Sequence, residues 1–148
     1  MLEELVADIL TDFTDEDGSA LVSEEYVERA AERSFPLIVA DLDEEFELDD
    51  SGEVTPEMSG PRREIWLTKT KIMVCRFLRA RSSSRVNFSS GDKKMDRSKE
   101  AANWAALEKD LASEYANRVR RINPAADESV LTTTIYPVRY SRGSQLEE

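Results

Sequence analysis

Two acidic turns and one cysteine are the parts of this chain whose residue types and spacing could support chemistry. In the first turn, Gly18 at the sixth position of a calcium-binding EF-hand loop would place Asp15 and Asp17 at the third and fifth positions and Glu24 at the twelfth. The first position would then be Phe13, which has no side-chain oxygen. A helix-breaking acidic turn explains this segment better than a calcium site.

The second acidic turn is also an incomplete match. With Gly52 at the sixth position, the first three ligand positions are Glu47, Asp49 and Ser51, but the twelfth is Met58. The bidentate carboxylate that completes an EF-hand is therefore missing. We expect a turn here as well, and no metal or other cofactor.

Cys75 is the only cysteine, so it cannot form an internal disulfide. A reactive thiolate needs an exposed, cationic environment. Arg76 is adjacent in sequence, but neighbouring residues on a helix do not face each other. We expect a buried thiol, because the flanking residues are mostly apolar: Ile72, Met73, Val74, Phe77 and Leu78.

Catalysis has little support elsewhere in the sequence. The chain has no histidine, and its five glycines are scattered and form no phosphate-binding loop. The carboxylates occur mainly in turns and on polar helix faces, where they would remain hydrated. We therefore expect a protein that is not an enzyme.

The charge distribution is strongly asymmetric. Residues 1–60 contain two basic and twenty acidic residues, a sum of −18, whereas residues 61–148 contain eighteen basic and eleven acidic residues, a sum of +7. Such asymmetry indicates partners rather than a fold. Head-to-tail association of copies and compensation within one chain are the favoured interpretations. A basic nucleic-acid patch, with twelve Lys or Arg between residues 62 and 99, is the third.

The length fits one domain, and the apolar spacing predicts an all-α fold, a small bundle of about four helices. A helical stripe covers residues 2–13. Ser23 is expected to cap a second helix whose narrow face is made of small residues and whose apolar side continues to Leu42. Pro36 should kink or interrupt that helix. Residues 43–60 are expected to form an acidic surface loop.

The second half of the chain should contain two longer helices. The third helix is expected over residues 61–81, ending at the serines 82–84, and its apolar middle makes it the central element. A small hairpin-like loop is expected over residues 88–95. The fourth helix is expected from residue 98 to the residue before Pro124.

The predicted domain boundaries are 1–124 for the helical domain and 125–148 for an extended C-terminal arm. Residues 130–140 are rich in β-branched and aromatic side chains, which favours a strand, and Pro137 restricts it to an edge. Such a strand would pair with another chain or with the 88–95 hairpin of its own chain. The candidate binding residues of the arm are Thr134, Ile135, Tyr136, Val138, Arg139 and Tyr140.

No segment is long and apolar enough for a membrane span of about 20 residues. The first residues, Met1 to Glu4, are acidic where a signal peptide would be basic. We therefore expect synthesis in the cytoplasm and no membrane association.

The order of these elements resembles the head–tail connector proteins (adaptors, or head-completion proteins) of long-tailed double-stranded DNA phages. The motif that carries the resemblance lies within residues 86–119. It comprises a polar turn with the sequence Asn-Phe-Ser-Ser-Gly-Asp at residues 87–92, then Met95 and Asp96, and then the helix from Trp104 to Tyr115. A long apolar helix, residues 65–80, precedes it. The acidic segment 43–60 and the long tail depart from the family pattern.

The resemblance implies a virion protein of the phage neck, made in the host cytoplasm. It implies a dodecameric ring beneath the portal that forms part of the DNA channel, through which DNA passes without specific binding. The implied partners are the portal protein above and a stopper or tail-completion protein below. The arm would bind the portal, and the polar turn would contact a neighbouring subunit or the next ring through Asn87, Phe88, Asp92, Lys93, Lys94 and Asp96.

A second interpretation comes from another class of protein. The acidic residues 1–60 would suit a DNA-mimic or regulatory protein that binds a DNA-binding partner. Such a protein would be a monomer or dimer and would form no ring.

Overall fold

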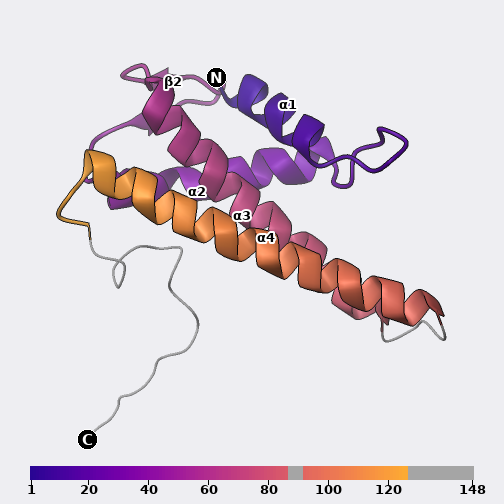
Figure 1. Ribbon diagram of the computed structural model, residues 1–148. Helices are drawn as coiled ribbons and strands as arrows, with labels where there is room; N and C mark the ends of the chain where they lie inside the picture. The colour runs from indigo at the N-terminus through magenta and orange to yellow at the C-terminus, as the bar shows by residue number, and fades with distance from the viewer. Residues whose placement is uncertain (87–91, 127–148) are drawn as a thin grey trace, which may run out of the picture.

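A computed structural model describes the backbone of residues 1–86 and 92–126, and the side chains of residues 1–82 and 99–126. In this part of the chain four helices form the body: α1 (Leu2–Asp12), α2 (Glu24–Leu42), α3 (Gly60–Val86) and α4 (Asp92–Ile122). Figure 1 shows α3 and α4 side by side as a long hairpin, with α1 and α2 packed against α3. The predicted all-α bundle is confirmed.

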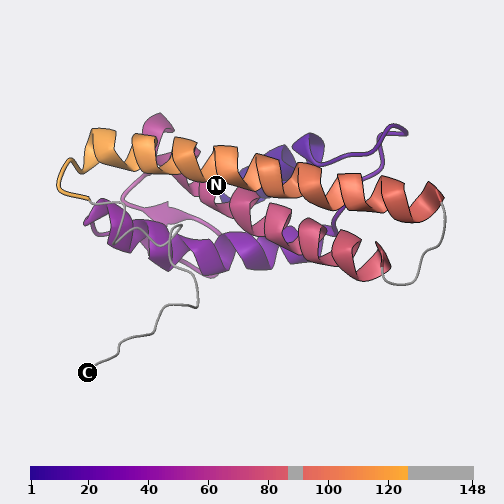
Figure 2. The same ribbon diagram turned by 60° about the horizontal axis from the view of Figure 1, so that its bottom comes forward.

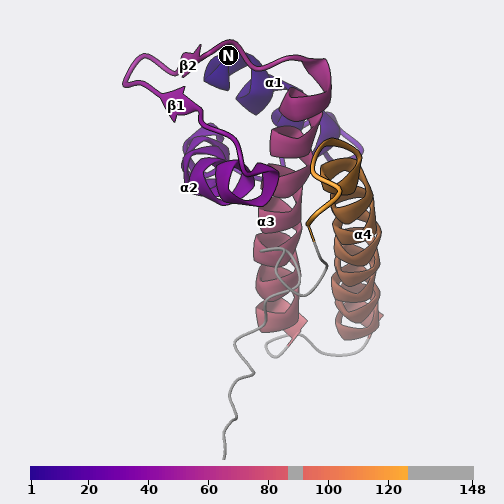
Figure 3. The same cartoon turned by 90° about the vertical axis from the view of Figure 1, so that its left-hand side faces the viewer.

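Helix α3 is the central element, as expected from its apolar middle. In Figure 3 it lies between α2 on one side and α4 on the other. Its buried side chains include Ile65, Trp66, Ile72, Val74 and Leu78. Because these residues point in several directions around the helix, α3 is covered by more than one neighbour.

Small residues on α2 allow close packing against α3. Ala31 and Ser34 are fully buried. The indole nitrogen of Trp66 donates to the carbonyl of Ala31 at 2.9 Å, and the hydroxyls of Ser34 and Thr70 lie 2.9 Å apart. Since buried polar groups are costly without partners, these bonds fix the register of the two helices.

The start of α2 agrees with the prediction, but Pro36 does not interrupt the helix. The Ser23 hydroxyl accepts the backbone N–H of Tyr26 at 3.1 Å. The helix then continues through Pro36 to Leu42. Pro36 is exposed, so water can bind the carbonyl that loses its helical partner.

The segment 43–60 is more ordered than the predicted surface loop. Strands β1 (Glu47–Leu48) and β2 (Val54–Thr55) pair in antiparallel register, Glu47 with Thr55 and Leu48 with Val54. Val54 and Met58 are buried in the core. These two apolar side chains anchor the acidic segment, which is why it does not behave as a simple loop.

Two predicted boundaries in the long hairpin are wrong. Helix α3 continues through the serines 82–84 to Val86, and the Ser82 hydroxyl donates to Glu100 of α4 at 2.8 Å. The low helix propensity of serine is overridden by the contact with α4. Figure 2 shows the two helices remaining together towards their connecting end.

Helix α4 begins at Asp92, earlier than the predicted residue 98. The hairpin-like loop predicted over residues 88–95 is therefore wrong for residues 92–95, while residues 87–91 lie outside the described residues. An acidic residue is favoured in the first turn of a helix, which is consistent with a start at Asp92. No helix within the described ranges is long and apolar enough to cross a membrane.

Candidate functional site

The predicted arm lies outside the part of the chain that the structure describes. This applies to all six candidate residues: Thr134, Ile135, Tyr136, Val138, Arg139 and Tyr140. Of the predicted contact turn, Asn87 and Phe88 are also outside the described residues. The other four, Asp92, Lys93, Lys94 and Asp96, lie in the first turns of α4.

The clearest surface feature is a groove between α1, α2 and the β1–β2 turn, which we call the acidic groove. It encloses about 420 Å³. Its floor includes the apolar side chains of Leu2, Val6 and Leu10. Its carboxylates are Glu3, Glu24, Glu28, Glu32, Asp49 and Asp50, and none of the described lysines or arginines lines it.

The carboxylates of α2 form a regular row in this groove. Glu24, Glu28 and Glu32 follow each other at intervals of four residues, and all three are exposed. Residues four apart lie on the same helix face, about 5–6 Å apart, where like charges destabilise a helix. The row therefore has an electrostatic cost that a cationic partner would remove.

The opposite wall of the groove is held in place by the N-terminus. The backbone N–H of Leu2 donates to the carbonyl of Gly52 at 3.0 Å, and the terminal ammonium lies 2.8 Å from Glu53. Within the turn, Asp49 Oδ1 accepts the N–H groups of Ser51 and Glu53, each at 2.9 Å. Hydrogen bonds from the Ser51 hydroxyl and from these amides lower the pKa of Asp49, so this wall remains anionic.

Neither acidic turn resembles a metal site in its geometry. Asp15 Oδ1 accepts the backbone N–H groups of Asp17 and Ser19, each at 2.9 Å, as Asp49 does in the second turn. These are bonds that stabilise a turn. Among the described residues, no three His, Cys, Asp or Glu side chains come together in a way that could hold a metal ion.

Part of the charge asymmetry is compensated within the chain. Arg62 forms two bonds to Glu44, at 2.6 and 2.7 Å, and these lower the pKa of the Glu44 carboxyl. Further along α3, Arg63 lies 2.7 Å from Asp8 and Lys71 lies 2.6 Å from Asp12. These pairs connect the basic helix α3 to the acidic first third of the chain.

The arginines in the second half of α3 also have internal partners. Arg76 and Arg79 each lie 2.8 Å from the carboxylate of Glu108, which is largely buried on α4. Arg81 donates to the carbonyl of Leu21 at 2.8 Å. All three arginines therefore have partners within their own chain.

A buried polar cluster, which sequence reasoning missed, joins α2, α3 and α4. The Tyr115 hydroxyl donates to Asp41, and the Asn123 amide donates to the Asp41 carbonyl at 3.0 Å. Lys69 is only 1% exposed, and its ammonium lies 5.3 Å from the centre of the Tyr115 ring. The signal was present in the sequence, because Lys69 occupies the same apolar stripe as Ile65 and Ile72.

Burial changes the acid–base properties of two groups without making them reactive. Desolvation, reinforced by Arg76 and opposed by Asp41, lowers the pKa of Lys69 to about 8. Desolvation and the Glu108 charge raise the pKa of Cys75 to about 12. Both side chains are closed off from solvent, so neither can meet a substrate. The predicted core position of Cys75 is confirmed.

Comparison of the chain with protein-family models, with curated proteins and with solved structures finds no match. The functional interpretation therefore depends on the geometry described above and on the resemblance in residues 86–119.

Proposed function

We propose that the protein is an adaptor subunit of a phage neck, a structural protein that forms a ring beneath the portal and part of the DNA channel. The observation on which this depends most is the α3–α4 hairpin. It carries the sequence that resembles the connector family, and it extends beyond the α1–α2 part of the body (Figure 3). Exposed ends of this kind suit contacts between copies in a ring.

The surface charge supports the same proposal. The net charge is −11, and exposed carboxylates concentrate on α1, α2 and the β1–β2 turn. DNA is a dense polyanion, so such a surface would repel it and allow passage without specific binding. The proposed partners are further copies in a ring, a dodecamer in the family resembled, the portal above, and a stopper or tail-completion protein below.

The arm is proposed to bind the portal through residues 134–140. A chain lacking residues 129–148 is expected to keep its helical circular dichroism, because it keeps every residue of the core cluster found among the described residues. It should no longer co-purify with the portal protein that is its proposed partner. A chain lacking only residues 143–148 is the matched control and should bind normally. Portal binding by the longer deletion would show that the arm has no such role.

The acidic groove favours a second candidate function, that of an acidic DNA mimic or regulatory protein. The regular row Glu24, Glu28 and Glu32 presents like charges at even spacing, as a nucleic-acid backbone does. This candidate predicts a monomer or dimer that competes with DNA for a basic partner. Competition with DNA, combined with no assembly on the portal, would favour it over the adaptor.

A further inference from the structure

We propose that the acidic groove receives the basic end of the α3–α4 hairpin from a second copy of this chain. We call that end the distal end: α3 from residue 82 and α4 to residue 100. The inference deepens the proposed function, because it names the two surfaces by which copies would join in the ring.

The composition of the groove favours the binding of a positively charged segment. Among the described residues no lysine or arginine lines it beside its six carboxylates, and like charges at intervals of four on α2 repel one another. Its floor adds apolar area from Leu2, Val6 and Leu10. The aliphatic stems of lysine and arginine can cover such a floor while their charged ends reach the carboxylates.

The described part of α3 does not supply this positive charge, because each of its basic residues already contacts a partner within its own chain. Every lysine or arginine between residues 60 and 82 makes an ion pair, a hydrogen bond or a ring contact: Arg62, Arg63, Lys69, Lys71, Arg76, Arg79 and Arg81. The next basic residues in sequence belong to the distal end. That segment has five basic residues, Arg85, Lys93, Lys94, Arg97 and Lys99, and three acidic ones.

The spacing of the two charged sets is matched. Lys93 and Arg97 are four residues apart on α4, the interval that also separates Glu24 from Glu28 and Glu28 from Glu32. Two helices that lie against each other with equal charge intervals can form successive ion pairs. Lys94, one position along, adds a third positive charge at the same level of α4.

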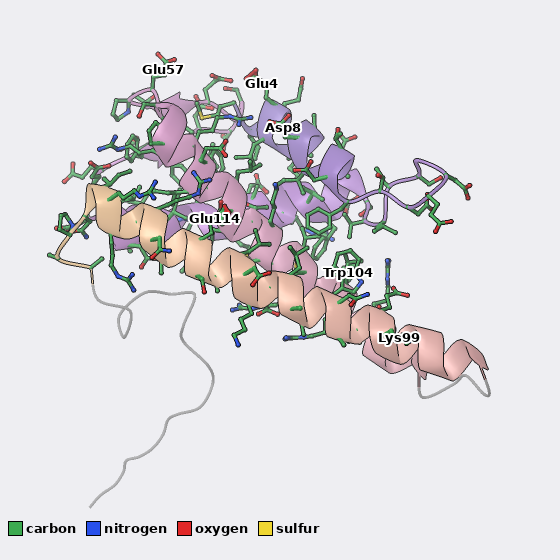
Figure 4. The ribbon with its side chains drawn as sticks, in the orientation of Figure 1. Glu4, Asp8, Glu57, Lys99, Trp104 and Glu114 are labelled. Atoms are coloured by element: carbon green, nitrogen blue, oxygen red, sulfur yellow. The ribbon has the colours of Figure 1, made fainter. Side chains whose placement is uncertain are left out.

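The distal end extends away from the elements that form the groove (Figure 3). α1 and α2 pack beside α3, and Arg81 of α3 still contacts the body, at Leu21. Both hairpin helices then continue beyond that level, and Figure 4 shows Lys99 near the far end of the hairpin. Joining two different surfaces gives a heterologous contact, which generates rings when the rotation closes.

Cysteine cross-linking tests the contact directly. Glu28→Cys and Arg97→Cys are made as separate single variants and treated with a short thiol-specific bismaleimide. Cys75 is buried and its pKa is about 12, so it should not react. Each variant alone should give no dimer, the mixture should give a dimer, and the double variant should give a ladder of higher oligomers.

The same reaction is run with and without the portal, so that the groove contact and the adaptor function can be contradicted independently of each other. A ring on the portal without the cross-link between positions 28 and 97 would overturn the groove contact and leave the adaptor function standing. The cross-link without any assembly on the portal would support the contact and contradict the adaptor function. If neither the cross-link nor assembly on the portal is observed, both proposals are overturned.

Charge reversal provides an independent test. Glu24→Lys, Glu28→Lys and Glu32→Lys together should weaken self-association at least tenfold, and so should Lys93→Glu, Lys94→Glu and Arg97→Glu together. Mixing the two triple variants should restore association. The matched control reverses three exposed carboxylates outside the groove, Glu4, Glu45 and Glu57, and should associate normally. Equal loss in the control, or no restoration in the mixture, would contradict the proposal.

Discussion

Burying the Lys69 ammonium is unfavourable, and this makes a testable prediction at the level of one residue. Its folded-state pKa of about 8 is lower than the ordinary value of 10.5, so the unfolded chain binds the proton more tightly. The free energy of unfolding should therefore rise as the pH increases through 8, by about 1 kcal/mol between pH 8 and 9. Urea unfolding at intervals across this range measures the change.

The control for that experiment is Lys69→Met, which has similar length and no charge. Cys75 has an ordinary pKa of 9.0, so in the unfolded chain it ionises within this range and offsets part of the rise, equally in both proteins. Between pH 8 and 9 the free energy of unfolding of the variant should rise by about 1 kcal/mol less than that of the unchanged protein. An unchanged pH dependence in Lys69→Met would show that Lys69 is not the group responsible.

The second residue-level prediction concerns the reactivity of Cys75. The side chain is 0% exposed and its pKa is raised to about 12, so almost no accessible thiolate exists at neutral pH. A disulfide reagent at pH 8 should modify the native protein only at the rate of unfolding, and should modify the urea-unfolded protein within seconds. Rapid modification of the native protein would contradict the buried position.

At the level of elements, Glu108 joins the two long helices. It is largely buried and pairs with Arg76 and Arg79, whose side chains are 35% and 42% exposed. Glu108→Gln should lower the free energy of unfolding by about 1–2 kcal/mol, less than for a fully buried pair because solvent screens the arginines. Glu114→Gln breaks the exposed pair with Arg118 and should cost less than about 0.5 kcal/mol. Equal costs for the two variants would contradict this role.

The turn beside the acidic groove gives a second prediction at this level. Gly52 has φ +87°, and an added Cβ would lie 3.1 Å from Leu2 Cβ. Gly52→Ala should therefore cost about 1–2 kcal/mol, through backbone strain and displacement of α1. Gly60→Ala is the control, because the added atom meets nothing within 4 Å and should leave stability nearly unchanged. Thermal unfolding of both variants measures the difference.

Periodicity predicted the helices well because burial of one apolar face largely determines where they form. Helix α1, the Ser23 cap and the central position of α3 all follow from such local patterns. The ends of α3 and α4 did not follow, since the contact of Ser82 with Glu100 of α4 is a tertiary interaction that local patterns do not show. The β1–β2 hairpin was missed for a related reason, because its anchors, Val54, Met58 and the contacts with the N-terminus, depend on tertiary packing.

The candidate site could be predicted only in part. The sequence showed the acidic excess in residues 1–60, but not which carboxylates are free to meet a partner. That division depends on tertiary pairing, which occupies Asp8, Asp12 and Glu44 and leaves the row on α2 exposed. The Lys69 cluster depends likewise on three helices meeting at one point.

At the level of the whole molecule, the groove is lined by carboxylates, whereas residues 85–99 of the α3–α4 hairpin contain five basic residues and two acidic ones. The first sixty residues sum to −18, and α3 neutralises only a few of them internally. Attraction between opposite ends of different copies should therefore depend on salt. Self-association measured by sedimentation should weaken as ionic strength rises from about 0.05 to about 0.5 M, because screening shortens the Debye length. Association that strengthens with salt would indicate an apolar contact instead.

Native mass measurement of the protein mixed with the portal protein that is its proposed partner tests the adaptor function most directly. We expect a complex in which one portal ring carries one closed ring of this chain, of the same copy number as the family's dodecamer, even where the chain alone is a monomer. A chain that remains a monomer or dimer at saturating portal concentration, with no bound species at any salt concentration, would contradict it.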